Sequence, residues 1–226
     1  MKRFWTEADA VERPGGWGIM LDGRPLKTPA RAELILPNAA LAEAVRAEWA
    51  AAGDTIDPRA MPLTGLANAA IDHPGHVLAA SLSRYAEADL FCYRATSPAK
   101  LVERQAAAWD PLLGWARRRF DVDFVVTSGV IHAAQPGATV ARLAHEVAAL
   151  DAFRLAALSP LVTIGGSLVA ALAMVERAIT AVAAWDAVSL DEQWQIEQWG
   201  DDAEAVASLA HRRDEFDAGA RFLALL

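Results

Sequence analysis

The chain has 226 residues, of which 54% are hydrophobic and 22% are charged, and its glycines and prolines are scattered along its length. This composition excludes an intrinsically disordered protein and predicts a globular fold with a sizeable core. The net charge of −8 argues against a nucleic-acid partner, because phosphates require basic patches. The single cysteine, Cys92, excludes an internal disulfide and fits a reducing compartment.

The first 37 residues predict a small antiparallel sheet. Turn formers, among them Pro14-Gly15-Gly16 and Asp22-Gly23, separate short runs that favour extended structure. We expect strands within residues 4–11, 17–21, 24–27 and 33–36.

From Asn38 onward, helical spacing of apolar residues replaces this pattern. Asn38 is a good helix entry, and Ser97 followed by Pro98 predicts the N-cap of another helix. Three arginines, Arg117 to Arg119, suit the C-terminal end of that helix. We expect helices over residues 38–53, 76–93, 97–120, 138–150, 153–159, 166–177 and 180–188, an extended crossing over 121–127, and one long final helix from Ser189. The fold class is therefore α+β, with an N-terminal β domain over residues 1–37 and a mainly α-helical domain over residues 38–226.

Residues 155–175 carry no charge and have about the length that a membrane span requires. The segment is nevertheless interrupted by Pro160, Gly165 and Gly166 and is rich in alanine, which favours a buried core helix that begins near Gly166. The N-terminus lacks the apolar core of a signal peptide. We therefore expect a cytoplasmic protein without membrane insertion.

The final helix carries the clearest internal pattern. Ser189 and Glu192 have the spacing of a capping box. A stripe at intervals of three and four residues predicts the core face, and this stripe places Trp199 in the core. Trp194 lies on another face of the helix and is expected to point outward. The residues of the stripe are Ile196, Trp199, Ala203, Val206 and Ala210.

The same region is strongly acidic, since residues 178–211 contain no Lys or Arg, and seven of the eight excess negative charges lie in residues 178–226. Acidic residues are not buried unpaired, and aromatic rings among outward carboxylates suit a surface that grips another protein. The alternative is a solvated helix whose tryptophans turn inward.

Enzymatic chemistry has less support in the sequence. Nucleotide-binding loops and a Gly-x-Ser-x-Gly elbow are absent. Asp201, Asp202 and Glu204 offer oxygen ligands for Mg²⁺, but side chains on one helix turn diverge by about 100° per residue. A carboxylate-based enzyme of unknown substrate, with or without Mg²⁺, is the alternative to a binding protein. We expect no cofactor.

Several segments form a collinear pattern from about Arg3 to Leu226. They include Leu21-Asp22-Gly23-Arg24-Pro25, Asp89-Leu90-Phe91-Cys92-Tyr93-Arg94-Ala95, Glu103-Arg104-Gln105, Trp109-Asp110-Pro111-Leu112-Leu113, and Trp199-Gly200-Asp201-Asp202-Ala203-Glu204-Ala205. The pattern resembles the assembly chaperones that attend the α subunit of the F-type ATP synthase catalytic head. Gly65 and Ala69 depart from the residues usual in that family.

The resemblance implies a bacterial, non-enzymatic protein that binds the free α subunit and shields its subunit interface until β replaces it. It also implies a small N-terminal β domain, a larger helical domain and a functional acidic C-terminal region. Carried over residue by residue, the partner-binding residues are Trp194, Glu197, Asp201, Asp202 and Glu204.

Overall fold

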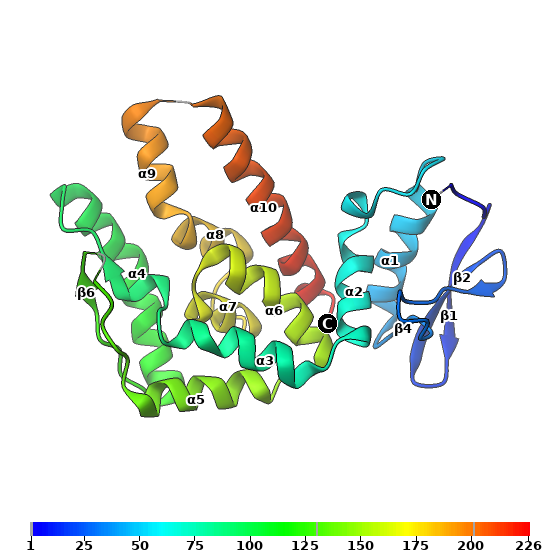
Figure 1. Cartoon of the computed structure of the whole chain (residues 1–226), viewed down its shortest axis with the longest axis horizontal. Coiled ribbons are helices and arrows are strands. Elements are labelled where there is room, and N and C mark those ends of the chain that lie inside the picture. Colours follow the sequence, from blue (N-terminus) through cyan, green and yellow to red (C-terminus); the bar gives the residue numbers. More distant parts are fainter. Residues whose placement is uncertain (1, 130, 201) are drawn as a thin grey trace.

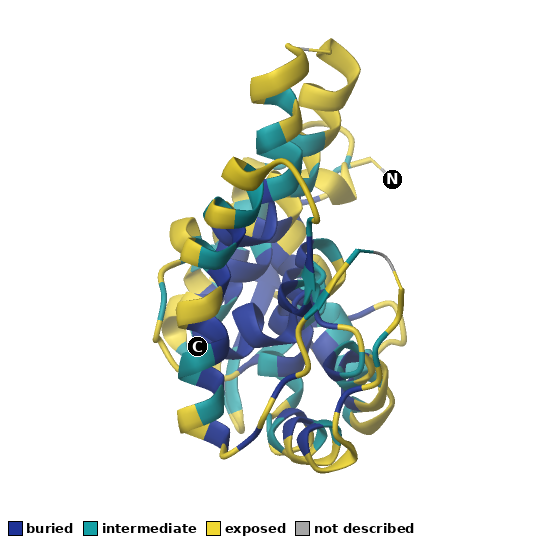
Figure 2. Cartoon of the chain, turned by 90° about the vertical axis from the view of Figure 1, so that its left-hand side faces the viewer, coloured by how far each residue is buried: buried dark blue, intermediate teal, exposed yellow. Residues whose placement is uncertain are grey.

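A small antiparallel sheet lies at one end of the molecule and helices make up the remainder, as the sequence predicts (Figure 1). The computed structural model describes residues 2–129, 131–200 and 202–226. Figure 2 shows a buried interior beneath a tip of two helices whose surfaces are largely exposed. The predicted α+β class is confirmed.

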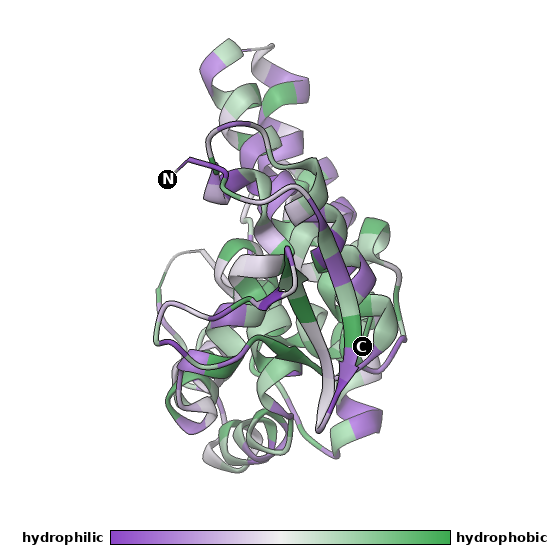
Figure 3. Ribbon diagram, turned by 90° about the vertical axis from the view of Figure 1, so that its right-hand side faces the viewer, coloured by the Kyte–Doolittle hydropathy of each residue, from purple (hydrophilic) through white to green (hydrophobic). Residues whose placement is uncertain are grey.

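The sheet is built on β2 (Gly16–Leu21), which pairs antiparallel with β1 (Ala8–Arg13) in a register that places Ala8 opposite Leu21. Two short strands, β3 (Arg24–Pro25) and β4 (Ile35–Leu36), pair with opposite ends of β2. Figure 3 views the molecule from this end, with the sheet in front and the helical tip in mixed purple and green above it. Buried apolar residues of the sheet pack against the first helix, which positions the sheet on the helical body.

Helices α1 (Ala39–Ala51) and α2 (Pro62–Asp72) share a hydrophobic core with the sheet and with the last residues of the chain. Asn38 caps α1 as predicted, since its side chain accepts a hydrogen bond from Leu41 N at 2.8 Å. The Asn38 amide also donates to Leu225 O at 2.8 Å, which joins the helix start to the C-terminus. The proposed domain boundary at residue 37 stays a prediction.

The remaining helices form a second core. Helix α6 (Ala152–Gly165) packs against α2, α3 (Gly75–Ser83), α7 (Leu168–Val175) and α10 (Ala203–Ala224). Around these lie α4 (Ala99–Phe120), α5 (Gly137–Ala148), α8 (Ala181–Val188) and α9 (Leu190–Trp199). A parallel two-stranded ladder joins β5 (Tyr93–Arg94) to β6 (Thr127–Ser128), where the sequence predicts an extended crossing.

Three predicted helix boundaries are wrong. The helix expected over residues 76–93 ends at Ser83 and gives way to short 3-10 turns, the last of which is capped by the buried Asp89 carboxylate accepting from Phe91 N. Ser97 does not cap α4, whose N-cap is Pro98. Helix α6 continues through Pro160 to Gly165, because Pro160 packs against Gly219 of α10, and this packing outweighs the local propensity of proline.

The uncharged segment divides at Gly166, whose φ of +69° ends α6. Most of its side chains lie in the core, and no helix within the described part of the chain is long and apolar enough to cross a membrane. Arg117 to Arg119 occupy the last turn of α4, as predicted. Cys92 is fully buried, and burial raises the pKa of its thiol to about 12, so it is a packing residue.

Candidate functional site

The acidic region forms a helical hairpin, made of α9 and α10, that rises above the core (Figures 1 and 2). The prediction of one continuous final helix is wrong. Gly200 has a φ of +85°, a conformation that glycine adopts without steric cost, and its amide caps α9 by donating to Ile196 O. The chain therefore leaves α9 at Gly200 and enters α10 in a new direction.

This break makes the predicted core stripe wrong. Trp199 is 80% exposed, Ile196 is only half-buried, and Ala203, Val206 and Ala210 are exposed. Residues on the two sides of Gly200 do not share one helical phase, so a stripe drawn across the break has no common face. Trp194, which the sequence predicts to point outward, is instead half-buried against the start of α4.

The predicted capping box is also wrong. Ser189 Oγ donates to Trp185 O at 2.6 Å and accepts from Gln193 Nε2 at 2.6 Å, so it makes no capping bond to α9. Glu192 instead accepts from Arg212 Nη1 at 2.8 Å, which joins α9 to α10. Arg212 also donates to Ile164 O at 2.9 Å and so fixes the hairpin to α6.

Polar contacts hold the other side of α9 against α4. Arg104 Nη1 lies 2.6 Å from Glu197 Oε2, and Gln105 Nε2 donates to Asp191 Oδ1 at 2.7 Å. The hydrogen bond from Arg104 lowers the pKa of Glu197, whereas burial raises the pKa of Asp191. Glu197 and Asp191 therefore have structural partners within the chain, which the sequence did not reveal.

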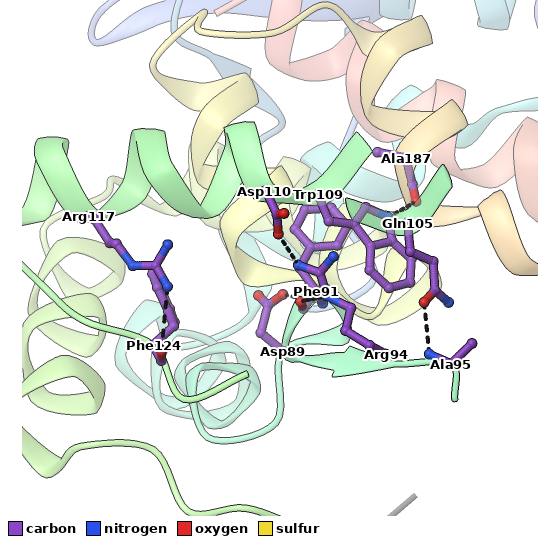
Figure 4. Close-up of polar contacts among 10 residues, drawn as sticks. All are labelled: Asp89, Phe91, Arg94, Ala95, Gln105, Trp109, Asp110, Arg117, Phe124 and Ala187. Atoms are coloured by element: carbon purple, nitrogen blue, oxygen red, sulfur yellow. Dashed lines mark hydrogen bonds and ion pairs between the residues drawn. The ribbon is translucent and has the colours of Figure 1, made fainter. Parts of the chain in front are cut away.

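A network around the buried Trp109 connects α4 to the end of α8 and to the segment near β5, as Figure 4 shows. Trp109 Nε1 donates to Ala187 O at 2.7 Å, at the end of α8 just before α9. Its ring stacks on Phe91 with centroids 5.5 Å apart and lies 5.1 Å from the Arg94 guanidinium carbon. Gln105 Oε1 accepts from Ala95 N at 2.8 Å. The segments that carry the family resemblance contain all of these residues except Ala187, but their spacing alone does not reveal the contacts.

The acidic residues that follow Gly200 have different surroundings from those of α9. Asp202 caps α10 by accepting from Glu204 N at 3.0 Å, and both side chains are exposed. Asp201 lies outside the described residues, so its predicted role stays a prediction. Elsewhere in the chain, within the described ranges, no three His, Cys, Asp or Glu side chains come together in a way that could hold a metal ion.

Among the clefts that border α9, two are lined by Trp199. One, of about 390 Å³, lies between α9 and α10 and is lined by Ile196, Trp199 and Leu209 among others. The second, of about 490 Å³, lies between α9 and the start of α4 and is lined by Leu101, Trp194 and Trp199 among others. The structure thus places Trp194, Glu197, Asp202 and Glu204 on one hairpin and adds Trp199 to its exposed surface.

Comparison with known proteins identifies relatives of the chain. The family model described as the ATP12 chaperone protein matches residues 2–117. The chain is 25% identical over 214 residues to the mitochondrial protein atp12 of Schizosaccharomyces pombe, covering 88% of this chain and 74% of that protein.

Solved structures show the same likeness over nearly the whole chain. The crystal structure of Atp12 from Paracoccus denitrificans is 42% identical, with a TM-score of 0.93 and coverage of 99% of this chain and 97% of that chain. A D202K mutant of the same P. denitrificans protein matches equally well. The Agrobacterium tumefaciens Atu1473 protein is 37% identical, with a TM-score of 0.92 and coverage of 99% and 85%. The predicted relationship to the ATP synthase assembly chaperones is confirmed, and the chain belongs to the ATP12 chaperone family.

Proposed function

We propose that the protein binds the free α subunit of the F-type ATP synthase catalytic head and shields the surface that α later gives to β. The α9–α10 hairpin is the docking surface in this proposal. The protein performs no reaction, requires no cofactor and acts in the bacterial cytoplasm. An exposed oligomerisation surface on an unassembled subunit is an aggregation hazard, and a temporary cover removes that hazard until β displaces it.

One observation carries the proposal: an exposed, acid-rich hairpin that bears tryptophans stands on a rigid helical core. Trp199 is 80% exposed, although large aromatic side chains are usually buried. Aromatic residues are enriched at protein interfaces, and carboxylates around them select a partner with complementary charge. Membership of a chaperone family supports a binding role for the protein as a whole.

The proposed partner-binding residues are Trp194, Glu197, Asp201, Asp202 and Glu204. Glu197 has an internal partner in Arg104 and Asp202 caps α10, so both also position the hairpin. Within the described residues no ion pair involves Glu204, which is exposed and free to meet a cationic partner. Glu204 is therefore the sharpest test among the acids, and Trp194 tests the aromatic part of the surface.

Co-expression tests the function. The α subunit is produced alone, with this protein, and with a folded protein of similar size and charge, and soluble α is measured. We expect soluble α to rise only with this protein, and we expect a smaller effect when β replaces α as the client. Equal amounts of soluble α in all three cultures would contradict the proposal.

Substitutions test the surface. Trp194→Ala and Glu204→Lys should weaken α binding while circular dichroism and thermal unfolding stay close to wild type. Trp115→Ala removes another half-buried tryptophan from the far end of α4, and Asp214→Lys reverses an exposed charge ten positions along α10, so these are the matched controls. Normal binding by either test variant would show that its residue lies outside the interface.

A further inference from the structure

We infer that Trp199 is the anchor of the docking surface and that its occupant is an apolar segment of the free α subunit flanked by Arg or Lys. This inference rests on the proposed function and adds to it the residue that carries most of the contact and the chemistry of the bound segment. Trp199 is the residue that the sequence pattern places in the core and that the structure exposes to 80%.

The geometry of α9 makes Trp199 part of both clefts. At about 100° per residue, Gln195 and Trp199 lie about 40° apart and form one ridge along the helix. The ridge lines the cleft toward α10 on one side and the cleft toward α4 on the other. A side chain that forms a wall of two adjoining clefts contacts whatever enters either of them.

The clefts have apolar surfaces at their sides. Ile196 and Leu209 contribute to the cleft toward α10, and Leu101 and Trp194 contribute to the cleft toward α4. Each cleft is large enough to take an apolar side chain of a partner, and Trp199 lies between the two clefts. Anchoring aromatics of this kind carry a large share of the binding energy at protein interfaces.

The charges around the two clefts indicate which residues flank the apolar side chains of the bound segment. Glu192 and Asp202 line the cleft toward α10, and Asp191 lines the cleft toward α4. Arg212 is the cation at the first cleft, but it is held by Glu192 and by Ile164 O. Residues 178–211 contain no Lys or Arg, and the cations that reach α9 from other elements, Arg104 and Arg212, are each paired with a carboxylate of α9. The remaining carboxylates keep the field around Trp199 negative and favour a cationic segment. An Arg or Lys of the partner can also lie over the exposed indole face.

Binding of purified α subunit to Trp199→Ala, Trp199→Phe and wild type, measured by titration calorimetry at low and high salt, tests the inference. We expect Trp199→Ala to raise Kd by about 30-fold or more and Trp199→Phe by less, since a phenyl ring retains part of the contact. We expect Kd for wild type to rise with salt, because the partner is cationic. The control is Phe4→Ala, which removes an aromatic side chain that is 63% exposed at the sheet end and should leave Kd unchanged.

The outcomes separate this inference from the proposed function. If wild type binds α and Trp199→Ala binds within threefold of it, the anchor is refuted and the proposed function stands. A Kd that does not change with salt refutes the cationic segment. If wild type does not bind α at all, the proposed function and this inference both fail. A wild-type dimer in sedimentation equilibrium that Trp199→Ala abolishes would show that a second copy of the chain fills the clefts, which also overturns the inference.

Discussion

Protonation of Asp89 should stabilise the fold as the pH falls from 7 to 5, and Asp89→Asn should remove this effect. The Asp89 carboxylate is fully buried and accepts from Phe91 N at 3.0 Å, Val169 N at 2.9 Å and Ser167 Oγ at 2.9 Å. Burial raises its pKa from 3.8 to about 6, and the hydrogen bonds oppose that rise without cancelling it. The side chain joins the turn before β5 to the start of α7.

The sign of this effect on stability follows from the direction of the pKa shift of Asp89. A carboxyl whose pKa is higher in the folded state than in the unfolded state binds protons more tightly when folded, so its contribution to stability is largest at low pH. That contribution is lost as the pH rises through about 6. Between pH 7 and pH 5 the free energy of unfolding should gain about 1.4 kcal/mol from this group, roughly tenfold in the folding equilibrium. For a chain of this length the gain is worth about 3–5 °C in Tm.

Urea denaturation of wild type and Asp89→Asn at pH 5, 6 and 7 measures the effect as a difference between the two proteins. Groups that are unaffected by the substitution contribute equally to both proteins and cancel in the difference. Carboxylates with lowered pKa, such as Asp22 and Glu43, stay ionised throughout it. We expect the stability of wild type relative to the variant to rise by about 1.4 kcal/mol from pH 7 to pH 5. A difference that is constant with pH, or that falls, would refute the reasoning.

Two further predictions concern packing. Gly219→Ala places a Cβ 2.6 Å from Pro160 Cγ and 3.0 Å from Ala157 O, so it should destabilise the protein by about 1–3 kcal/mol in urea denaturation. Gly65→Ala meets no atom within 4 Å in the exposed part of α2 and should instead be neutral or stabilise by up to about 1 kcal/mol; a cost as large as at Gly219 would contradict the packing argument. Trp109→Phe leaves Ala187 O without its donor and weakens the contacts with Phe91 and Arg94, so it should cost about 2–4 kcal/mol. A loss below about 0.5 kcal/mol would show that water or a neighbour replaces that hydrogen bond.

Local signals predicted the order of elements well. Turn residues such as Asp22-Gly23 separate the strands, and Asn38 caps α1 as its residue type suggests. These features depend on a few neighbouring residues, which a sequence displays directly. The family resemblance, carried by segments such as Trp109-Asp110-Pro111, gave the membership that the comparisons confirm.

Features that depend on distant contacts were not predictable. Helix α6 passes through Pro160 because α10 presents Gly219 there, and the segment around Asp89, which the sequence predicts to be helical, is held in a turn by the contacts of that carboxylate with Ser167 and Val169. In each case the contacting residues lie more than fifty positions apart in the sequence. Local propensity is a weak prior when tertiary contacts of this kind oppose it.

The position of Trp199 in the candidate site was also predicted incorrectly from local periodicity. The periodic pattern that placed Trp199 in the core assumes a continuous helix, and Gly200 removes that continuity. Large aromatic side chains on an apolar helical stripe are usually buried. An exposed one departs from the rule by which apolar periodicity predicts the core face of a helix. Such violations concentrate where function opposes stability, which is why the incorrect assignment of Trp199 directs attention to the proposed docking surface.

Charge alone therefore does not identify the acids that touch a partner. Glu197 is paired with Arg104, Glu192 with Arg212, and Asp202 caps α10, so three members of the acidic region have internal roles. Glu204 stands in the first turn of α10, where a negative charge favours the helix through its dipole by about 0.3–1 kcal/mol. Glu204→Lys opposes that dipole, whereas Glu204→Gln removes the charge with little change in shape. If Glu204 contacts a cationic segment, Glu204→Gln should weaken α binding without lowering Tm by more than about 3 °C. If Glu204 acts only by stabilising α10, Glu204→Gln should weaken α binding only as far as it lowers the stability of the hairpin.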